Sequence, residues 1–96
     1  MKVVWSEAAL RHLEAIHDYI SGDSLTYAKR MVDRLTVKSK RAASFPEFGQ
    51  MVPEYQRPDV REIIEGPYRI VYRIEIDRVV IVAVIHGASA LPPNLS

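Results

Sequence analysis

Basic side chains on three predicted strands are placed so that they could act on a phosphate. Arg61, Arg69 and Arg73 lie on two neighbouring strands, and His86 ends the strand that follows, directly before Gly87. Guanidinium groups bind phosphate oxygens and stabilise the charge of a phosphoryl-transfer transition state. A histidine at the end of a strand can serve as a general acid or base. These residues therefore indicate a site on a sheet face that binds or cleaves a phosphate.

A structural role accounts for the same residues. Three acids on the same strands could neutralise the arginines, namely Glu62, Glu65 and Glu75. A lone histidine at a strand end is also commonly structural, so both interpretations stay open at this point.

A second set of cations follows the predicted second helix. Arg30, Arg34, Lys38 and Arg41 recur at steps of four, four and three residues, which aligns them along one side of the helix. The row is either an ordinary solvated face or an electrostatic footprint for a phosphate backbone or an acidic partner.

The motifs of other chemistries are missing from the sequence. It has no glycine-rich phosphate loop and no supported Ser-His-Asp arrangement. His12 and His17 are five residues apart on one helix, which is the wrong spacing for a shared metal, so they are expected at the surface or half-buried. The lack of cysteine excludes disulfides, thiolate metal ligands and a thiol nucleophile. We expect no cofactor and no metal.

Composition restricts the class of protein. The chain has 96 residues, of which 48% are hydrophobic and 26% charged, as in one ordinary globular domain. The net charge of +1 argues against a protein that works mainly by coating nucleic acid. Its longest apolar stretch, residues 79–85, is about a third of a bilayer span, and the amino terminus lacks a signal-peptide core. We expect a cytoplasmic protein.

Two helices are predicted in the first half of the chain. Ser6 is a favourable N-cap, and the apolar residues of 7–21 form one stripe at helical spacing: Ala9, Leu13, Ile16 and Ile20. Gly22 should end this helix. Asp23 or Ser24 should cap a second helix that reaches about residue 43 and forms an antiparallel hairpin with the first.

The second half has the pattern of a β-meander. Strands are predicted at 60–65, 68–76 and 79–85, joined by short turns at Gly66-Pro67 and Asp77-Arg78. A loop with three prolines precedes them and holds a short extended piece around Met51-Val52. In the middle strand, one face should pack on the helices, and it consists of Tyr68, Ile70, Tyr72, Ile74 and Ile76. The last strand is apolar on both faces, which is typical of an interior strand.

These elements predict an α+β fold in the chain order β-α-α-β-β-β. Residues 2–5 supply the first strand, and the two-helix hairpin packs on one face of a mostly antiparallel four-stranded sheet. Residues 1–88 should form one domain, and residues 89–96, with two prolines, should form a loose tail.

Several short motifs also follow one another in a particular order. They are Ala9-x-x-x-Leu13-x-x-Ile16-x-x-Tyr19-Ile20, Pro46-Glu47-Phe48-Gly49, Val52-Pro53-Glu54, Arg61-Glu62, Tyr68-Arg69-Ile70-Val71-Tyr72-Arg73 and Val84-Ile85-His86-Gly87. This order, over residues 3 to about 88, resembles the RelE/ParE superfamily of toxins from type II toxin–antitoxin modules. The resemblance implies a small cytoplasmic toxin that a cognate antitoxin, encoded beside it, holds inactive.

The resemblance implies one of two targets. RelE-like members cut messenger RNA in the ribosomal A site, whereas ParE-like members block DNA gyrase. Arg61 and Arg69 match basic positions with which RNA-cleaving members hold the phosphate, and His86 could carry a proton if this interpretation holds. Ile63 and the segment Ala88-Ser89-Ala90, however, stand where such relatives carry charge. Half of the RNA-cleaving set is therefore absent, which favours the ParE branch.

Binding surfaces follow from the same interpretation. The candidate target-binding residues are Arg30, Arg34, Lys38, Arg41 and Arg73. The antitoxin should cover apolar surface that so small a domain leaves open, at Val80, Val82 and Val84 or in the groove beside the helices. A non-toxic module that binds nucleic acid or protein through the helix cations is the remaining alternative.

Overall fold

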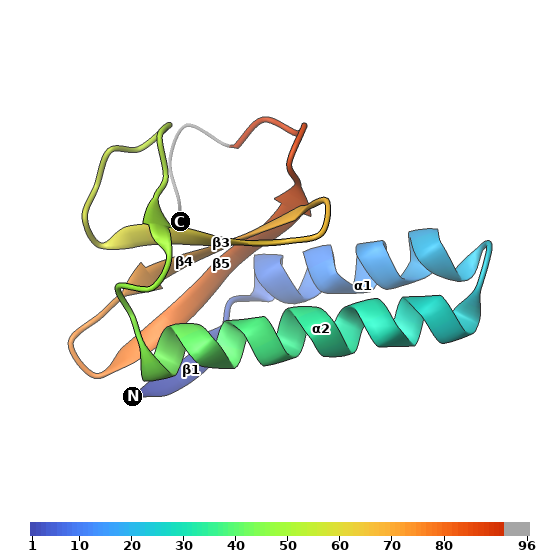
Figure 1. Cartoon of the computed structure of the whole chain (residues 1–96), viewed down its shortest axis with the longest axis horizontal. Helices are drawn as coiled ribbons and strands as arrows, with labels where there is room; N and C mark the ends of the chain where they lie inside the picture. Colours follow the sequence, from blue (N-terminus) through green and yellow to red (C-terminus); the bar gives the residue numbers. More distant parts are fainter. Residues whose placement is uncertain (92–96) are drawn as a thin grey trace.

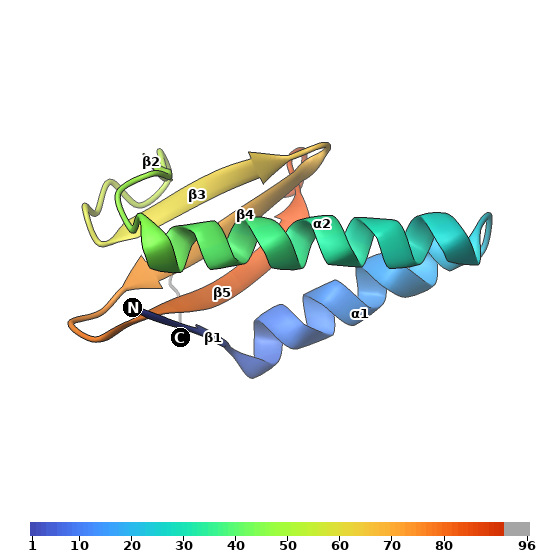
Figure 2. The same ribbon diagram turned by 60° about the horizontal axis from the view of Figure 1, so that its bottom comes forward.

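Two antiparallel helices cover one face of a twisted five-stranded sheet (Figure 1). The computed structural model describes residues 1–91. Its elements follow the chain order β-α-α-β-β-β-β. The end of the hairpin at which the helices join extends past the edge of the sheet (Figure 2), so this part of both helices has no strand beneath it.

Serine caps determine where both helices begin. Helix α1 (Glu7–Ser21) begins after Ser6, whose hydroxyl accepts the Ala9 N–H at 3.1 Å. Helix α2 (Leu25–Ser44) begins after Ser24, whose hydroxyl accepts the Tyr27 N–H at 3.1 Å. Each cap satisfies an N–H that the first helical turn leaves without a partner. The predicted hairpin is confirmed, and of the two candidate caps of α2 it is Ser24 that acts.

The sheet has the spatial order β1-β5-β4-β3-β2. Its strands are β1 (Lys2–Trp5), β2 (Gln50–Met51), β3 (Val60–Glu65), β4 (Tyr68–Ile74) and β5 (Arg78–His86). Strand β1 pairs in parallel with β5, and the other neighbours are antiparallel. The predicted meander is confirmed. The predicted count of four strands is one too low, because the extended piece near Met51 pairs with β3 as a fifth strand.

A bulge in β5 distributes its apolar residues between both faces. Tyr72 pairs with Ile81 while Val71 pairs with Ala83, which leaves Val82 as the extra residue. On the helix side the strand contributes Val79, Ile81 and Val84, and on the other side Val80, Val82 and Ala83. This strand is therefore interior and covered on both faces, as predicted.

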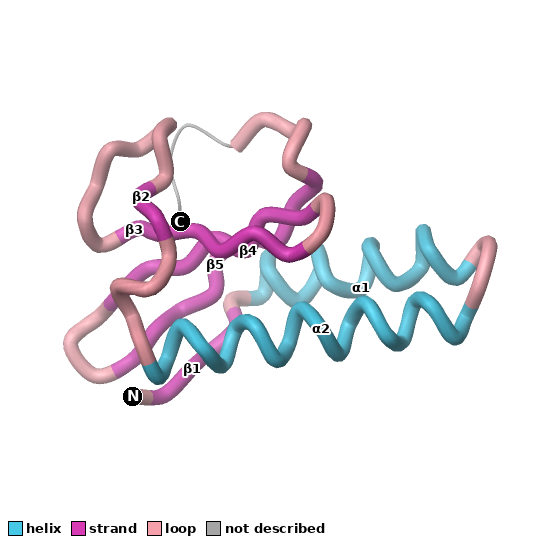
Figure 3. Tube along the Cα trace, in the orientation of Figure 1, coloured by secondary structure: helices cyan, strands magenta, loops and turns pink. Residues whose placement is uncertain are grey.

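The outer face of the sheet is covered by the chain itself. Val52 and Tyr55, from the loop between β2 and β3, pack there against Val80 and Val82, and Leu91 joins them after β5. Figure 3 shows both loops on the side of the sheet away from the helices. Of the two predicted places for a partner, the valines are therefore covered, and Val84 is buried on the helix side. The groove beside the helices remains as the other predicted place.

Two other sequence predictions have mixed outcomes. Tyr68, Ile70, Tyr72 and Ile74 do pack on the helix side, but Ile76 is 99% exposed because β4 ends at Ile74 and the chain turns. Of the predicted tail 89–96, residues 92–96 lie outside the described residues, and Leu91 contacts the outer face.

Candidate functional site

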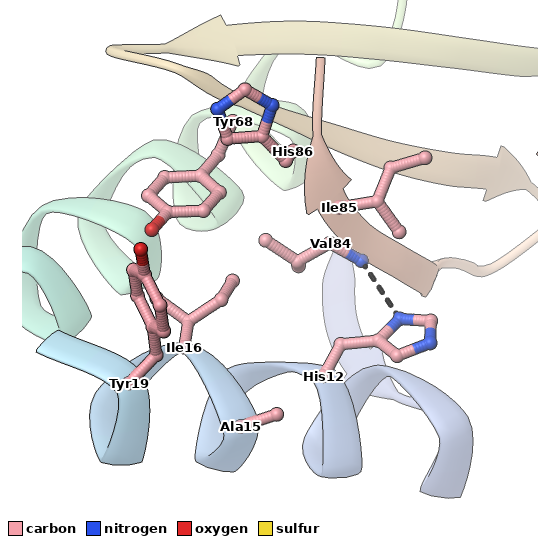
Figure 4. A pocket seen from close by; sticks show the side chains of 8 residues that line it. All are labelled: His12, Ala15, Ile16, Tyr19, Tyr68, Val84, Ile85 and His86. Carbon is pink, nitrogen blue, oxygen red and sulfur yellow. Dashed lines mark hydrogen bonds between the residues drawn. The ribbon is translucent and has the colours of Figure 1, made fainter. Parts of the chain in front are cut away.

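A groove of about 340 Å³ lies between α1 and the end of β5 (Figure 4). Ala15, Ile16, Val84 and Ile85 contribute apolar surface, and the rings of Tyr19, Tyr68, His12 and His86 complete the lining. The hydroxyl groups of Tyr19 and Tyr68 point into the same end of the groove (Figure 4). Burial and the neighbouring tyrosines raise the pKa of Tyr68, so it stays neutral near pH 7. The groove therefore favours an apolar group with a few polar contacts.

His86 stands at the rim of this groove and is exposed. Its ring meets the Tyr68 ring edge-on, with centroids 6.0 Å apart at 82°. Its Nδ1 accepts the Ala88 N–H at 3.1 Å, so the neutral ring carries its proton on Nε2. The turn after β5 thereby orients His86, and Nε2 is the nitrogen left to exchange a proton.

His12 lies across the groove and is fixed by β5. Its Nδ1 accepts the Val84 N–H at 3.2 Å (Figure 4). Partial burial, together with nearby Arg11, lowers the pKa of His12. It is half-buried, as is His17, in agreement with the sequence prediction. The sequence reasoning missed the place of His12 in the groove, although its spacing of four residues before Ile16 puts both on one side of α1.

Arg69 is committed to two carboxylates on the outer face of the sheet. Its Nε donates to Glu62 at 2.6 Å, and its Nη1 donates to Glu54 at 2.8 Å. The Glu62 side chain is 3% exposed and that of Arg69 11%. The hydrogen bonds to Arg69 lower the pKa of Glu54 to about 2, and those to Glu54 and Glu62 raise the pKa of Arg69. This guanidinium is therefore neutralised within the chain.

Arg61 lies on the opposite face of the sheet from Arg69. It has the same parity on β3 as Ile63, which packs among the helix-side residues. Its guanidinium donates to the carbonyl oxygens of Pro58 at 3.0 Å and Gly49 at 3.1 Å. It thus ties the loop before β2 to the loop before β3. The prediction that three guanidiniums share one face is wrong for Arg61.

Arg73 shares the outer face with Arg69, as predicted, and is also paired. Its Nε and Nη2 donate to Glu75 at 3.1 and 3.0 Å. Of the acids expected to neutralise strand arginines, Glu62 and Glu75 do so, whereas Glu65 pairs with Arg34 of α2. Both arginines of the outer face, Arg69 and Arg73, are therefore neutralised by carboxylates of the chain.

The cations of α2 lie at the surface of the helix. Arg34 is paired with Glu65, and the Arg41 guanidinium lies 5.6 Å from the centre of the Phe48 ring. Arg30 and Lys38 make no ion pair within residues 1–91. The helix holds Arg30, Arg34, Lys38 and Arg41 on one rigid element, as the spacing predicts.

The three candidate catalytic residues do not meet. His86 faces the groove on the helix side, Arg69 points to the outer face, and Arg61 lies at the far end of β3. Strand β4 shows the separation directly, because Tyr68 beside His86 and its neighbour Arg69 point to opposite faces. A phosphate placed at His86 therefore has neither of these guanidiniums facing it.

Comparisons with known proteins identify the family. The family model described as the ParE toxin of the type II toxin–antitoxin system parDE matches residues 3–91. The chain belongs to the ParE toxin family. It is a type II toxin of the RelE/ParE superfamily, as the order of its motifs indicates.

Two relatives give the extent of the likeness. The toxin is 36% identical over 87 residues to Toxin RelE2 of Caulobacter vibrioides, and the match covers 91% of this chain and 96% of that protein. A solved chain of the chromosomal ParDE TA system from P. aeruginosa shares its fold with a TM-score of 0.74. That match has 22% identity and covers 90% of the toxin and 95% of the solved chain.

The described part of the toxin lacks both a membrane-spanning helix and a group of metal ligands. Neither helix is long and apolar enough to pass through a membrane. No three acidic or histidine side chains among residues 1–91 are grouped so that they could hold one metal ion.

Proposed function

We propose that this toxin stops growth by binding its target without cutting RNA, and that the target is DNA gyrase. The observation that carries the proposal is the separation of His86 from Arg61 and Arg69, both of which make hydrogen bonds within the chain. Cleavage through a ribose 2′-hydroxyl needs a base, an acid and cations around one phosphate. Each positioned acid or base contributes about 10²- to 10⁴-fold in rate. His86 alone could supply only one of these groups, a single acid or base, with neither Arg61 nor Arg69 beside it.

The family assignment supports the choice of gyrase. The matching family model is that of ParE rather than an RNA-cleaving branch, and it spans nearly the whole described chain. A relative named RelE2 keeps ribosome-dependent mRNA cleavage as the alternative to be tested.

The first experiment is induction of the toxin alone while DNA synthesis and protein synthesis are followed separately. We expect DNA synthesis to fall first, with filamentation and gyrase-linked DNA damage. Early arrest of translation would overturn the proposal in favour of mRNA cleavage. Normal growth would show that the protein is not toxic and would favour the remaining alternative, a non-toxic binding module.

Substitution of His86 separates the two modes of action without harming the fold. His86 is exposed, so His86→Ala removes the remaining proton carrier at little structural cost. Growth inhibition should be unchanged, as it should be with His17→Ala, a control on α1 outside the groove. Loss of inhibition with His86→Ala alone would show that His86 acts in the toxic reaction.

Membership of the ParE toxin family implies a cognate antitoxin. We propose that the carboxy-terminal segment of this antitoxin fills the groove between α1 and β5. The groove is apolar, about 340 Å³ in volume and rimmed by the exposed ring of Tyr19. An apolar side chain of the antitoxin could enter it and exclude water.

Ala15 provides the test of this contact, because it lines the groove from the exposed side of α1. Ala15→Glu should abolish rescue by the co-expressed antitoxin while toxicity persists. The matched control is Leu10→Glu, which puts the same charge on an exposed position of α1 outside the groove. Full rescue of the Ala15→Glu toxin would exclude the groove as the antitoxin site.

A further inference from the structure

The charges of this toxin are strongly segregated. Helix α2 contains six of its thirteen Lys and Arg residues and one of its twelve acidic residues. The rest of the chain therefore holds seven basic and eleven acidic side chains. The helix carries +5 and the remainder −4, which the overall charge of +1 conceals.

Four cations of α2 form a row along one side of the helix. Arg30, Arg34 and Lys38 are four residues apart, so successive charges are about 6 Å apart along the axis, and Arg41 extends the row. The helix turns Ala28, Met31 and Leu35 toward the core. Figure 2 shows α2 running uninterrupted along the molecule in front of the sheet.

Most of this charge is not neutralised by the chain. Lys29, Arg30, Lys38 and Lys40 form no ion pair within the described residues. Two carboxylates lie beside the row. One of them, Glu65, is paired with Arg34, and the other is Asp33, the single acid of the helix.

We propose that this cationic face of α2 binds the phosphate backbone of duplex DNA. The row spans about 16 Å of a rigid helix, so it can follow the dense phosphates of a duplex, which carries one negative charge per about 1.7 Å of its axis. The negative remainder of the molecule is repelled by the same polyanion, so it turns α2 toward the DNA.

This inference rests on the proposed function for its biological role, because gyrase works on DNA and a toxin bound there could reach the duplex. It is tested without gyrase, so the two can fail separately. Growth inhibition with no DNA binding would overturn the inference and leave gyrase inhibition standing.

The experiment is fluorescence anisotropy of the purified toxin with a labelled 24-base-pair duplex between 50 and 200 mM salt. If the three cations of the row that form no ion pair within the described residues, Arg30, Lys38 and Arg41, contact phosphates, the slope of log K against log salt should be about −2.7, since each contact contributes about 0.9. Arg30→Gln with Lys38→Gln should make the slope shallower by about 1.8.

The matched control is Lys2→Gln with Arg11→Gln. These residues are also exposed and make no ion pair in the described chain, so the control changes the net charge by the same amount away from the row. The control should keep the wild-type slope, and far-ultraviolet circular dichroism should show both variants folded. Equal slopes for the two variants, or polyglutamate competing as well as DNA, would overturn the proposal.

Discussion

Replacing Arg69 with alanine should lower the free energy of unfolding by about 3–5 kcal/mol, which is the usual cost of removing one partner from a buried ion pair. Arg69 bridges Glu62, which is 3% exposed, and Glu54, which is 43% exposed. Without the guanidinium, the Glu62 carboxylate stays buried on the outer face with no counter-charge. The loop that carries Glu54 also loses its tie to β4.

The two carboxylates should contribute very unequally to this loss. The exposed pair with Glu54 is worth about 0.2–1 kcal/mol, because water screens it. Nearly all of the remainder belongs to Glu62. A drop of about 3 kcal/mol should lower the Tm by at least about 12 °C in a domain of this size.

Urea unfolding followed by Trp5 fluorescence measures these differences. Glu54→Ala should cost under about 1 kcal/mol. Arg69→Met combined with Glu62→Leu should recover most of the loss, because an apolar pair of similar volume can replace a buried ion pair. If Arg69→Ala unfolds at the wild-type urea concentration, Arg69 is not committed to Glu62. It would then be free to hold an RNA phosphate, and RNA cleavage would become the favoured mode of action.

Three further predictions concern single side chains. Tyr72→Phe should cost about 1–3 kcal/mol in urea unfolding, because the Tyr72 hydroxyl is buried and satisfies two backbone groups of the loop before β2. Glu54 has a folded pKa of about 2, below its ordinary 4.5, because it is paired with Arg69. This pair stabilises the fold fully above pH 4.5, and its contribution to stability disappears as the pH falls toward 2. Glu54→Gln should therefore flatten that part of a plot of unfolding free energy against pH. The pKa of His12 is lowered in the folded toxin, so protonation of His12 favours the unfolded chain, and the free energy of unfolding should decrease as the pH falls below 6.5. His12→Gln cannot be protonated and should abolish this decrease.

Local signals were sufficient to predict the helices and most strands. The caps Ser6 and Ser24 and the helical spacing of apolar residues lie within a few residues of what they determine. Ile76 shows the limit of such signals. The alternation of apolar and polar residues continues to Ile76, but strand β4 ends at Ile74 and Ile76 is exposed. A pattern in sequence does not mark where pairing ends.

The face on which Arg61 lies could have been predicted. A two-residue turn at Gly66 pairs Glu65 with Tyr68, and counting back pairs Arg61 with Tyr72, which belongs to the helix side. The partners of Arg69 are a different case. Glu54 comes from a long irregular loop, and its distance in sequence gives no indication that it reaches β4.

The groove could not be derived from the sequence, because it depends on how α1 crosses β5. His12 and Tyr19 come from the helix, and Tyr68 and His86 come from two strands more than forty residues later in the chain. Packing of distant elements brings them together, and no local pattern reports it. The opposite orientation of Arg69, by contrast, follows from alternation along β4, because its neighbour Tyr68 faces the helices. From this separation of Arg69 and His86 we propose that the toxin does not cleave RNA.

Gyrase inhibition and RNA cleavage are separated most directly by two reactions run with one preparation of purified toxin. Gyrase supercoiling of relaxed plasmid is assayed beside cleavage of a messenger RNA held on ribosomes. We expect supercoiling to be inhibited equally by the wild-type toxin and by His86→Ala, and the messenger RNA to stay intact. Efficient cleavage in the ribosomal A site, abolished by His86→Ala and accompanied by normal supercoiling, would contradict this expectation.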